Sequence, residues 1–201
     1  MNQPEITELL HALHNGNQDA WEQLTPLVYD NLKKIAHNRL RRERNGHTLQ
    51  STEIIGELYL RLMGDERDWK GRTHFYAHCS VLMRNILVEW ARSRPRRIGV
   101  REGQRVTFDK ALVVAAGEEE NIIVQIHDAL KDLEKLYPRQ ARVVELKFFG
   151  GLTNEEVGTV LGYSSKSIGR DWKFAQTWLK RQIGGALPHD FATTSTHSRI
   201  I

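Results

Sequence analysis

Near its C-terminus the chain carries a group of side chains whose chemistry suits the binding of DNA. The group comprises Ser165, Lys166, Ser167, Arg170 and Lys173. Cationic side chains bind phosphate, and arginine and serine also donate hydrogen bonds to base edges in the major groove. The segment 164–182 contains five basic residues and a single acid, Asp171. The alternative is a helical hairpin whose charges are merely solvated.

Two helices joined by a short turn, a helix-turn-helix, are expected to carry this group of side chains. Thr153 is a good N-cap, and Glu156 three residues later completes a capping box. Gly162 suits the left-handed residue that ends a helix, and Ser164 can cap the next one. The second helix keeps one apolar stripe, formed by Ile168, Trp172, Ala175, Leu179 and Ile183. A short helix followed by a longer basic helix is typical of DNA-binding proteins, because the second helix fits the major groove.

A second constellation could bind a metal ion. His74 and His78 are four residues apart on an expected helix, and Cys79 is adjacent. The glutamate of an HExxH motif is absent because position 75 is phenylalanine, and a zinc site needs further convergent ligands. We therefore predict neither metal nor cofactor. A metal-dependent helical enzyme that uses His74 and His78 remains the alternative from another functional class.

Composition and charge favour a protein that works in the cytoplasm on a polyanion. Hydrophobic residues make up 40% of the 201 residues, and the net charge of +4 conceals separate basic clusters. These clusters are Arg39, Arg41, Arg42 and Arg44; then Arg92, Arg94, Arg96 and Arg97; then the last long helix. Segregated charge of this kind suggests contact with a polyanion at several places. The single cysteine excludes an internal disulfide, and no apolar run approaches the roughly 20 residues of a membrane span. The first residues include early acids and no apolar stretch after a basic start, so we expect no signal peptide there.

Apolar periodicity predicts an all-α protein of two small helical domains joined by a flexible linker. Expected helices cover 6–13, 17–40 with Pro26 as a kink or break, 51–64, 73–94, 122–136, 139–149 and the helix-turn-helix. Periodicity is lost after Pro95. The expected division is therefore a first domain at 1–97, a linker at 98–117, a second domain at 118–183, and a disordered tail at 184–201.

With these elements in place, residues 1–183 resemble a bacterial sigma factor of the extracytoplasmic-function (ECF) type in the sigma-70 family. Such proteins contain only regions two and four of that family. The stretch TEIIGELYLRL at 52–62 is similar to the region-two helix that docks on the RNA polymerase clamp. The resemblance implies that Glu53, Glu57 and Arg61 contact core polymerase, with Gly56 where the family usually has glutamine.

The next helix resembles the region-two segment that melts and reads the −10 promoter element. Phe75, Leu82, Arg84, Asn85 and Glu89 have the spacing of that family. The resemblance implies that Asn85 and the loop at 65–71 hold a flipped, single-stranded base, which needs hydrogen bonds and an apolar wall. Residues assigned to −10 DNA are thus Arg84, Asn85, Arg92, Arg94, Arg96 and Arg97, and Trp69 and Trp90 are also expected to face DNA.

The segment YPRQARVVELKFFGGLTNEEVGTVLGYS is similar to region four, which reads the −35 element. The resemblance places Ser165, Lys166, Ser167, Arg170 and Lys173 at the major groove and directs Arg139 and Arg142 toward phosphate. Gly169 lies inside the expected recognition helix, where glycine costs roughly 1 kcal/mol relative to alanine.

Together these similarities imply a promoter-specificity subunit without catalysis of its own. Its expected partners are core RNA polymerase (clamp and flap), promoter DNA and an anti-sigma factor. Two alternatives remain: a transcriptional regulator that acts without replacing sigma, and the metal-dependent enzyme described above.

Overall fold

A computed structural model describes residues 3–40, 47–65, 68–93 and 122–183. All regular structure in these ranges is helical, which confirms the all-α prediction. The helices are α1 (Gln3–His14), α2 (Ala20–Leu40), α3 (His47–Met63), α4 (Arg72–Ser93), α6 (Ile122–Leu136), α7 (Pro138–Val144), η2 (Glu145–Phe149), α8 (Asn154–Leu161) and α9 (Ser165–Gln182). None of them is long and apolar enough to cross a membrane. The predicted linker and tail lie outside the described residues.

Helices α1 to α4 form an N-terminal bundle whose core follows the helical period of the sequence. The buried side chains include Leu24, Val28 and Leu32 of α2, Ile54, Leu58 and Leu62 of α3, and Phe75, Met83 and Leu87 of α4. Two expectations need correction. A break at Pro26, one of the two alternatives expected there, is wrong because α2 continues through this residue, and α3 begins at His47, four residues before the expected cap at Ser51.

Helices α6 to α9 form a C-terminal bundle that contains an unexpected π-helical segment. Pro138 occupies the first turn of α7, as its fixed φ angle favours. The helix predicted over 139–149 changes at Glu145 into η2, in which the amide of Gly150 donates to the carbonyl of Glu145 at 3.3 Å. All five residues of η2 are buried, including Glu145 and Lys147. Because five consecutive residues are buried, more than one face of η2 lies in the interior.

The helix-turn-helix has the caps that the sequence predicts. Thr153 and Glu156 form a complete capping box at α8, and Gly162 ends this helix with φ of 74°. Ser164 accepts a hydrogen bond from the amide of Ser167 at the start of α9. Gly158 allows the two helices to approach, because a Cβ atom there would lie 2.4 Å from the carbonyl oxygen of Tyr163.

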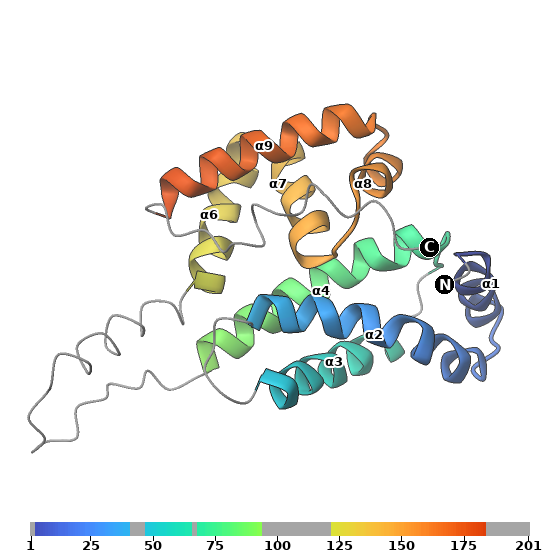
Figure 1. The fold of residues 1–201 in the computed structure, drawn as a ribbon. Coiled ribbons are helices and arrows are strands. Elements are labelled where there is room, and N and C mark those ends of the chain that lie inside the picture. The colour runs from blue at the N-terminus through green and yellow to red at the C-terminus, as the bar shows by residue number, and fades with distance from the viewer. Residues whose placement is uncertain (1–2, 41–46, 66–67, 94–121, 184–201) are drawn as a thin grey trace, which may run out of the picture.

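Within the N-terminal bundle, α4 is the helix that packs against the C-terminal bundle, with α2 and α3 on one side of it and α6, η2 and α8 on the other (Figure 1). The Arg39 guanidinium donates to the Phe148 carbonyl at 2.7 Å and stacks on its ring. Gly150 lies against Ser80 of α4, so that a Cβ atom there would be 2.8 Å from that of Ser80. Buried side chains therefore form a continuous core through both bundles.

Candidate nucleic-acid interface

Helix α9 presents a basic face to solvent and an apolar face to the core. Lys166, Arg170 and Lys173 are exposed. The predicted stripe of Ile168, Trp172, Ala175 and Leu179 is buried, and Ile183 is partly buried against the core. Among the described residues, the three exposed cations form no ion pair with a carboxylate. Their charge is therefore available to an anionic partner.

Hydroxyl groups at the start of α9 are held by hydrogen bonds. The Ser165 hydroxyl donates to Glu155 at 2.8 Å, and this bond is the main reason why the pKa of Glu155 is lowered. Arg170 donates to the Ser167 hydroxyl at 3.3 Å. The first turn of α9 is thus fixed to α8. The sequence analysis did not assign this role to Glu155, although its position in the first turn of α8 is a signal.

The preceding helix is joined to α9 by a buried carboxylate. Arg139 and Gln140 both donate to the Asp171 carboxylate at 2.8 Å, and Asp171 is only 5% exposed. The Arg139 guanidinium also lies over the Tyr163 ring, 4.8 Å from its centroid. Arg142 pairs with Glu145. These two arginines, expected to meet phosphate, thus have acidic partners, and Asp171 has a structural role that its sequence position did not reveal.

The residues predicted to act on −10 DNA differ in their surroundings. Asn85 is exposed, whereas Arg84 is only 9% exposed. Arg84 donates to Nδ1 of His127 at 3.1 Å and pairs with Glu145 at 3.2 Å. Exposed Arg92 is 3.5 Å from the Asp128 carboxylate. Arg94, Arg96 and Arg97 lie outside the described residues.

The prediction that Trp69 faces DNA is wrong for this structure. Trp69 is 2% exposed and packs edge-on against Phe75, with ring centroids 5.4 Å apart. Its indole is apolar enough to fill the core beneath the loop before α4. Trp90 is only partly buried.

The histidines considered as metal ligands are engaged in other contacts. His78 is 2.8 Å from Asp65 and stacks with Trp69, and Nδ1 of His74 accepts from the Lys70 amide at 3.4 Å. Within the described part of the chain, His, Cys, Asp and Glu side chains do not gather in groups of three or more that could hold a metal ion.

A third surface is formed by the outward face of α3. Glu53 and Glu57 are exposed, and Arg61 pairs with Glu57 at 2.8 Å and with Glu89 of α4 at 2.5 Å. Leu60 and Met63 lie beside them with 69% and 63% of their surface exposed. The outward face of α3 thus combines charged side chains with two large apolar side chains that are exposed.

The fold thus defines an all-helical protein with a capped helix-turn-helix, a basic outer helix and an acidic, partly apolar face on α3. The family model described as ECF sigma factor matches residues 3–185, so the chain belongs to the ECF sigma factor family. The chain is 23% identical over 189 residues to the ECF RNA polymerase sigma factor BldN of Streptomyces coelicolor. That alignment covers 92% of this chain and 67% of the relative. No solved structure matches the chain.

Membership of this family implies RNA polymerase binding and promoter-directed transcription initiation. Proteins of this family are specificity subunits of the polymerase.

Proposed function

We propose that the chain binds core RNA polymerase, reads the −35 element with α9 and opens the −10 element with α4. The observation that carries this proposal is the exposed basic face of α9, held on a capped helix-turn-helix. Lys166, Arg170 and Lys173 would meet phosphates and base edges, while Ser165 and Ser167 are positioned beside them. Since phosphate contacts fix the register and base contacts specify the sequence, this face suits a duplex reader.

Opening of the −10 element is assigned to α4 and the residues that follow it. Asn85 is exposed on α4 and can hydrogen-bond the edge of an unstacked base. The remaining assigned residues are Arg84, Arg92, Arg94, Arg96 and Arg97. Cationic side chains of this kind follow the backbone of a single strand irrespective of sequence.

Polymerase binding is assigned to Glu53, Glu57 and Arg61, with the clamp as their partner. The exposed apolar side chains Leu60 and Met63 adjoin this face and would add buried apolar area. The Arg61 pairs with Glu57 and Glu89 fix the face against α4. Polymerase bound at this face would therefore be linked through Arg61 to α4, the helix to which opening of the −10 element is assigned.

The experiment is abortive initiation with core polymerase on genomic promoter fragments, using both supercoiled and pre-melted templates. Arg170→Gln is expected to reduce product about fivefold or more, because a good base contact contributes roughly 1–3 kcal/mol. Asn85→Ala should be impaired on closed templates and largely rescued on pre-melted ones. Lys180→Gln is the matched control, since it removes a cation from the same helix outside the assigned face.

Polymerase binding is tested separately, by co-purification of the chain with core enzyme. Glu57→Lys should weaken this association, whereas Glu134→Lys at an exposed position of α6 should not. A chain that binds duplex DNA but never associates with core polymerase would instead be a regulator that acts without replacing sigma.

A further inference from the structure

One large apolar side chain lies on the solvent-facing side of the basic helix α9. Phe174 is 42% exposed, whereas the other exposed side chains of this helix are polar or charged. Single exposed apolar residues are normal on protein surfaces, so the meaning of this one depends on its neighbours. The proposed function does not yet assign it a role.

Phe174 continues a row of side chains that begins with Ser167 and Arg170. Arg170 is four residues before it and Ser167 seven, so the three share one face of the helix. The Arg170 guanidinium donates to the Ser167 hydroxyl at 3.3 Å. At roughly 1.5 Å per residue, the row spans about 10 Å, or about three base-pair steps of duplex DNA. A helix that reads a base with Arg170 therefore brings the phenyl ring close to a neighbouring base pair.

The phenyl ring is held in place by an aromatic neighbour. Tyr137 meets it edge-on, with ring centroids 4.8 Å apart and ring planes inclined by 70°. Tyr137 is the N-cap of α7, and the first turn of α7 is joined to α9 by the hydrogen bonds of Arg139 and Gln140 to Asp171. A side chain that packing already holds loses less rotamer freedom when it binds a partner.

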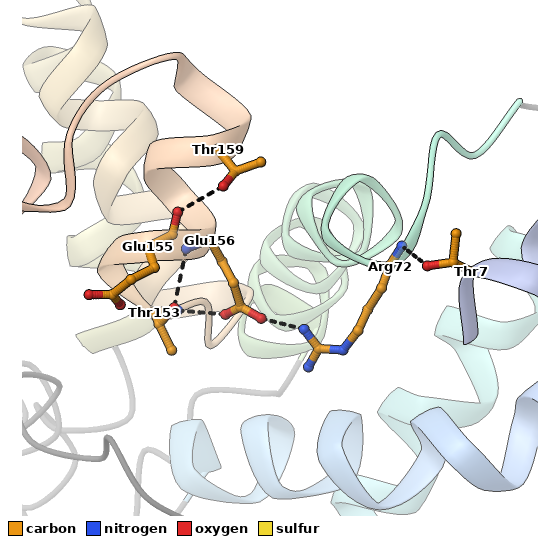
Figure 2. A network of polar contacts seen from close by, with 6 residues as sticks. All are labelled: Thr7, Arg72, Thr153, Glu155, Glu156 and Thr159. Carbon is orange, nitrogen blue, oxygen red and sulfur yellow. Dashed lines mark hydrogen bonds and ion pairs between the residues drawn. The ribbon is translucent and has the colours of Figure 1, made fainter. Parts of the chain in front are cut away.

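The helix-turn-helix is itself anchored to the rest of the molecule. At the start of α8, Glu156 closes the capping box of Thr153 and pairs with the Arg72 guanidinium of α4 (Figure 2). Glu155, in the same turn, accepts a hydrogen bond from the Ser165 hydroxyl at 2.8 Å. Side chains of α8 and α4 thus fix the direction in which α9 presents its exposed face.

We propose that Phe174 is a specificity-determining residue of α9 and contacts the C5-methyl group of a thymine in the −35 duplex. This inference rests on the proposed function and names a base preference of the same site. The thymine methyl is an apolar group in the major groove, and phenylalanine is one of the side chains that suit it. The thymine lies within about two base pairs of the one that Arg170 contacts, because four helical residues rise about 6 Å.

The charges around Phe174 favour DNA over a protein as its partner. Arg170 and Lys173 are exposed on the same helix, and Arg181 follows seven residues later on the same face. Cations attract phosphate, whereas lysine is depleted at the cores of protein interfaces. The neighbouring Leu136 is 64% exposed, so a protein that covers it together with Phe174 is the alternative that the experiment decides.

Deoxyuridine tests the proposal, because it lacks only the C5-methyl group of thymine and keeps the same base pairing. Holoenzyme formed by the full chain and core polymerase is bound to a promoter fragment that supports initiation, and each −35 thymine of either strand is replaced singly. For wild type, one replacement should weaken binding about fourfold, as expected for one buried methyl-sized group. Phe174→Ala should bind thymine and deoxyuridine equally at that position and keep the wild-type response elsewhere.

Two further variants separate the methyl contact from a general loss of packing. Phe174→Leu keeps an apolar side chain and should retain part of the response to the methyl group. Leu136→Ala removes exposed apolar surface beside Tyr137 but outside α9, and its deoxyuridine profile should match wild type. Circular dichroism checks that each variant is folded, which the exposure of both side chains favours.

The assignment is overturned if wild type responds to no single replacement, or if Phe174→Ala keeps the wild-type response at every position. Loss of core association by both Phe174→Ala and Leu136→Ala, with unchanged deoxyuridine profiles, would identify a protein contact and overturn it as well. Weaker binding by Arg170→Gln without any methyl response would leave the proposed function standing and remove only the role of Phe174. Absence of core-dependent initiation by wild type would overturn the proposed function, and the base preference with it.

Discussion

At the level of single residues, the backbone around Gly158 and Gly56 shows how differently two helical glycines can act. At Gly158 a Cβ atom would lie 2.4 Å from a backbone oxygen of the turn, which cannot move without disturbing Ser164 and α9. At Gly56, on the exposed face of α3, a Cβ atom would have no neighbour within 4 Å. The first glycine is therefore required by packing, and the second is not.

Alanine at these two positions should change stability in opposite directions. Gly158→Ala is expected to lower the free energy of unfolding by about 1–3 kcal/mol, as overpacking does. Gly56→Ala should raise it by about 0.5–1 kcal/mol, because alanine favours the helix. Urea unfolding followed by circular dichroism measures both. Equal effects of the two substitutions would contradict this account.

Local side-chain chemistry explains which residues the sequence could identify. The caps Thr153, Gly162 and Ser164 depend only on their immediate neighbours, and the structure confirms them. The partners of Arg84 lie 43 and 61 residues away along the chain, so no local pattern connects them. The one available signal was a glutamate and a lysine within the apolar run at 143–149.

At the level of elements, the contact between α4 and α6 places a histidine where its protonation is unfavourable. Burial lowers the pKa of His127, and the nearby Arg84 guanidinium and Lys131 lower it further. Asp128 raises this pKa, whereas Arg92 lowers it. The neutral ring is needed because its Nδ1 accepts the hydrogen bond from Arg84.

This histidine should make stability depend on pH. Its pKa is lower in the folded chain than the unfolded value of about 6.5, so the unfolded chain binds the proton more readily. The stabilisation that the neutral His127 ring contributes is complete above about pH 6.5, and it is lost as the pH falls through the pKa of His127 in the folded chain. We expect His127→Asn to reduce the loss of unfolding free energy between pH 7 and pH 5. Parallel pH profiles for wild type and variant would refute this.

Element boundaries were predicted well where caps define them and poorly where packing does. The local pattern did not show that α2 continues through Pro26 or that the helix after Pro138 changes into η2. A buried charged residue of η2 illustrates why a local pattern does not specify packing. Lys147 is 1% exposed and lies over the Trp172 ring at 5.6 Å, an environment that a linear pattern does not specify.

At the level of the whole molecule, the continuous core predicts cooperative unfolding. Buried side chains of α4 pack on the other N-terminal helices and on the C-terminal bundle. Neither bundle can therefore unfold without exposing apolar surface of the other. We expect a single calorimetric transition whose calorimetric and van't Hoff enthalpies agree. The double variant Arg72→Gln, Glu145→Gln should show two transitions. Two transitions in wild type would contradict the continuous core.

The sequence predicted two helical domains but not their mutual packing. Hydrophobic periodicity identifies which face of a helix is buried, and α4 is buried on more than one side. A face covered by α3 and a face covered by η2 produce the same apolar signal. Domain boundaries at 97 and 118 therefore remain predictions, since the segment that contains them lies outside the described residues.

The single thiol of the chain lies in the middle of α4. Cys79 is 1% exposed, and burial raises its pKa well above the usual range. Because the thiolate is the reactive form, oxidants and alkylating reagents have almost no target in the folded chain. Alkylation at Cys79 would then proceed only when the helices around α4 separate. The alkylation rate, measured by mass spectrometry on the chain without an engineered label, would therefore report how often these helices separate.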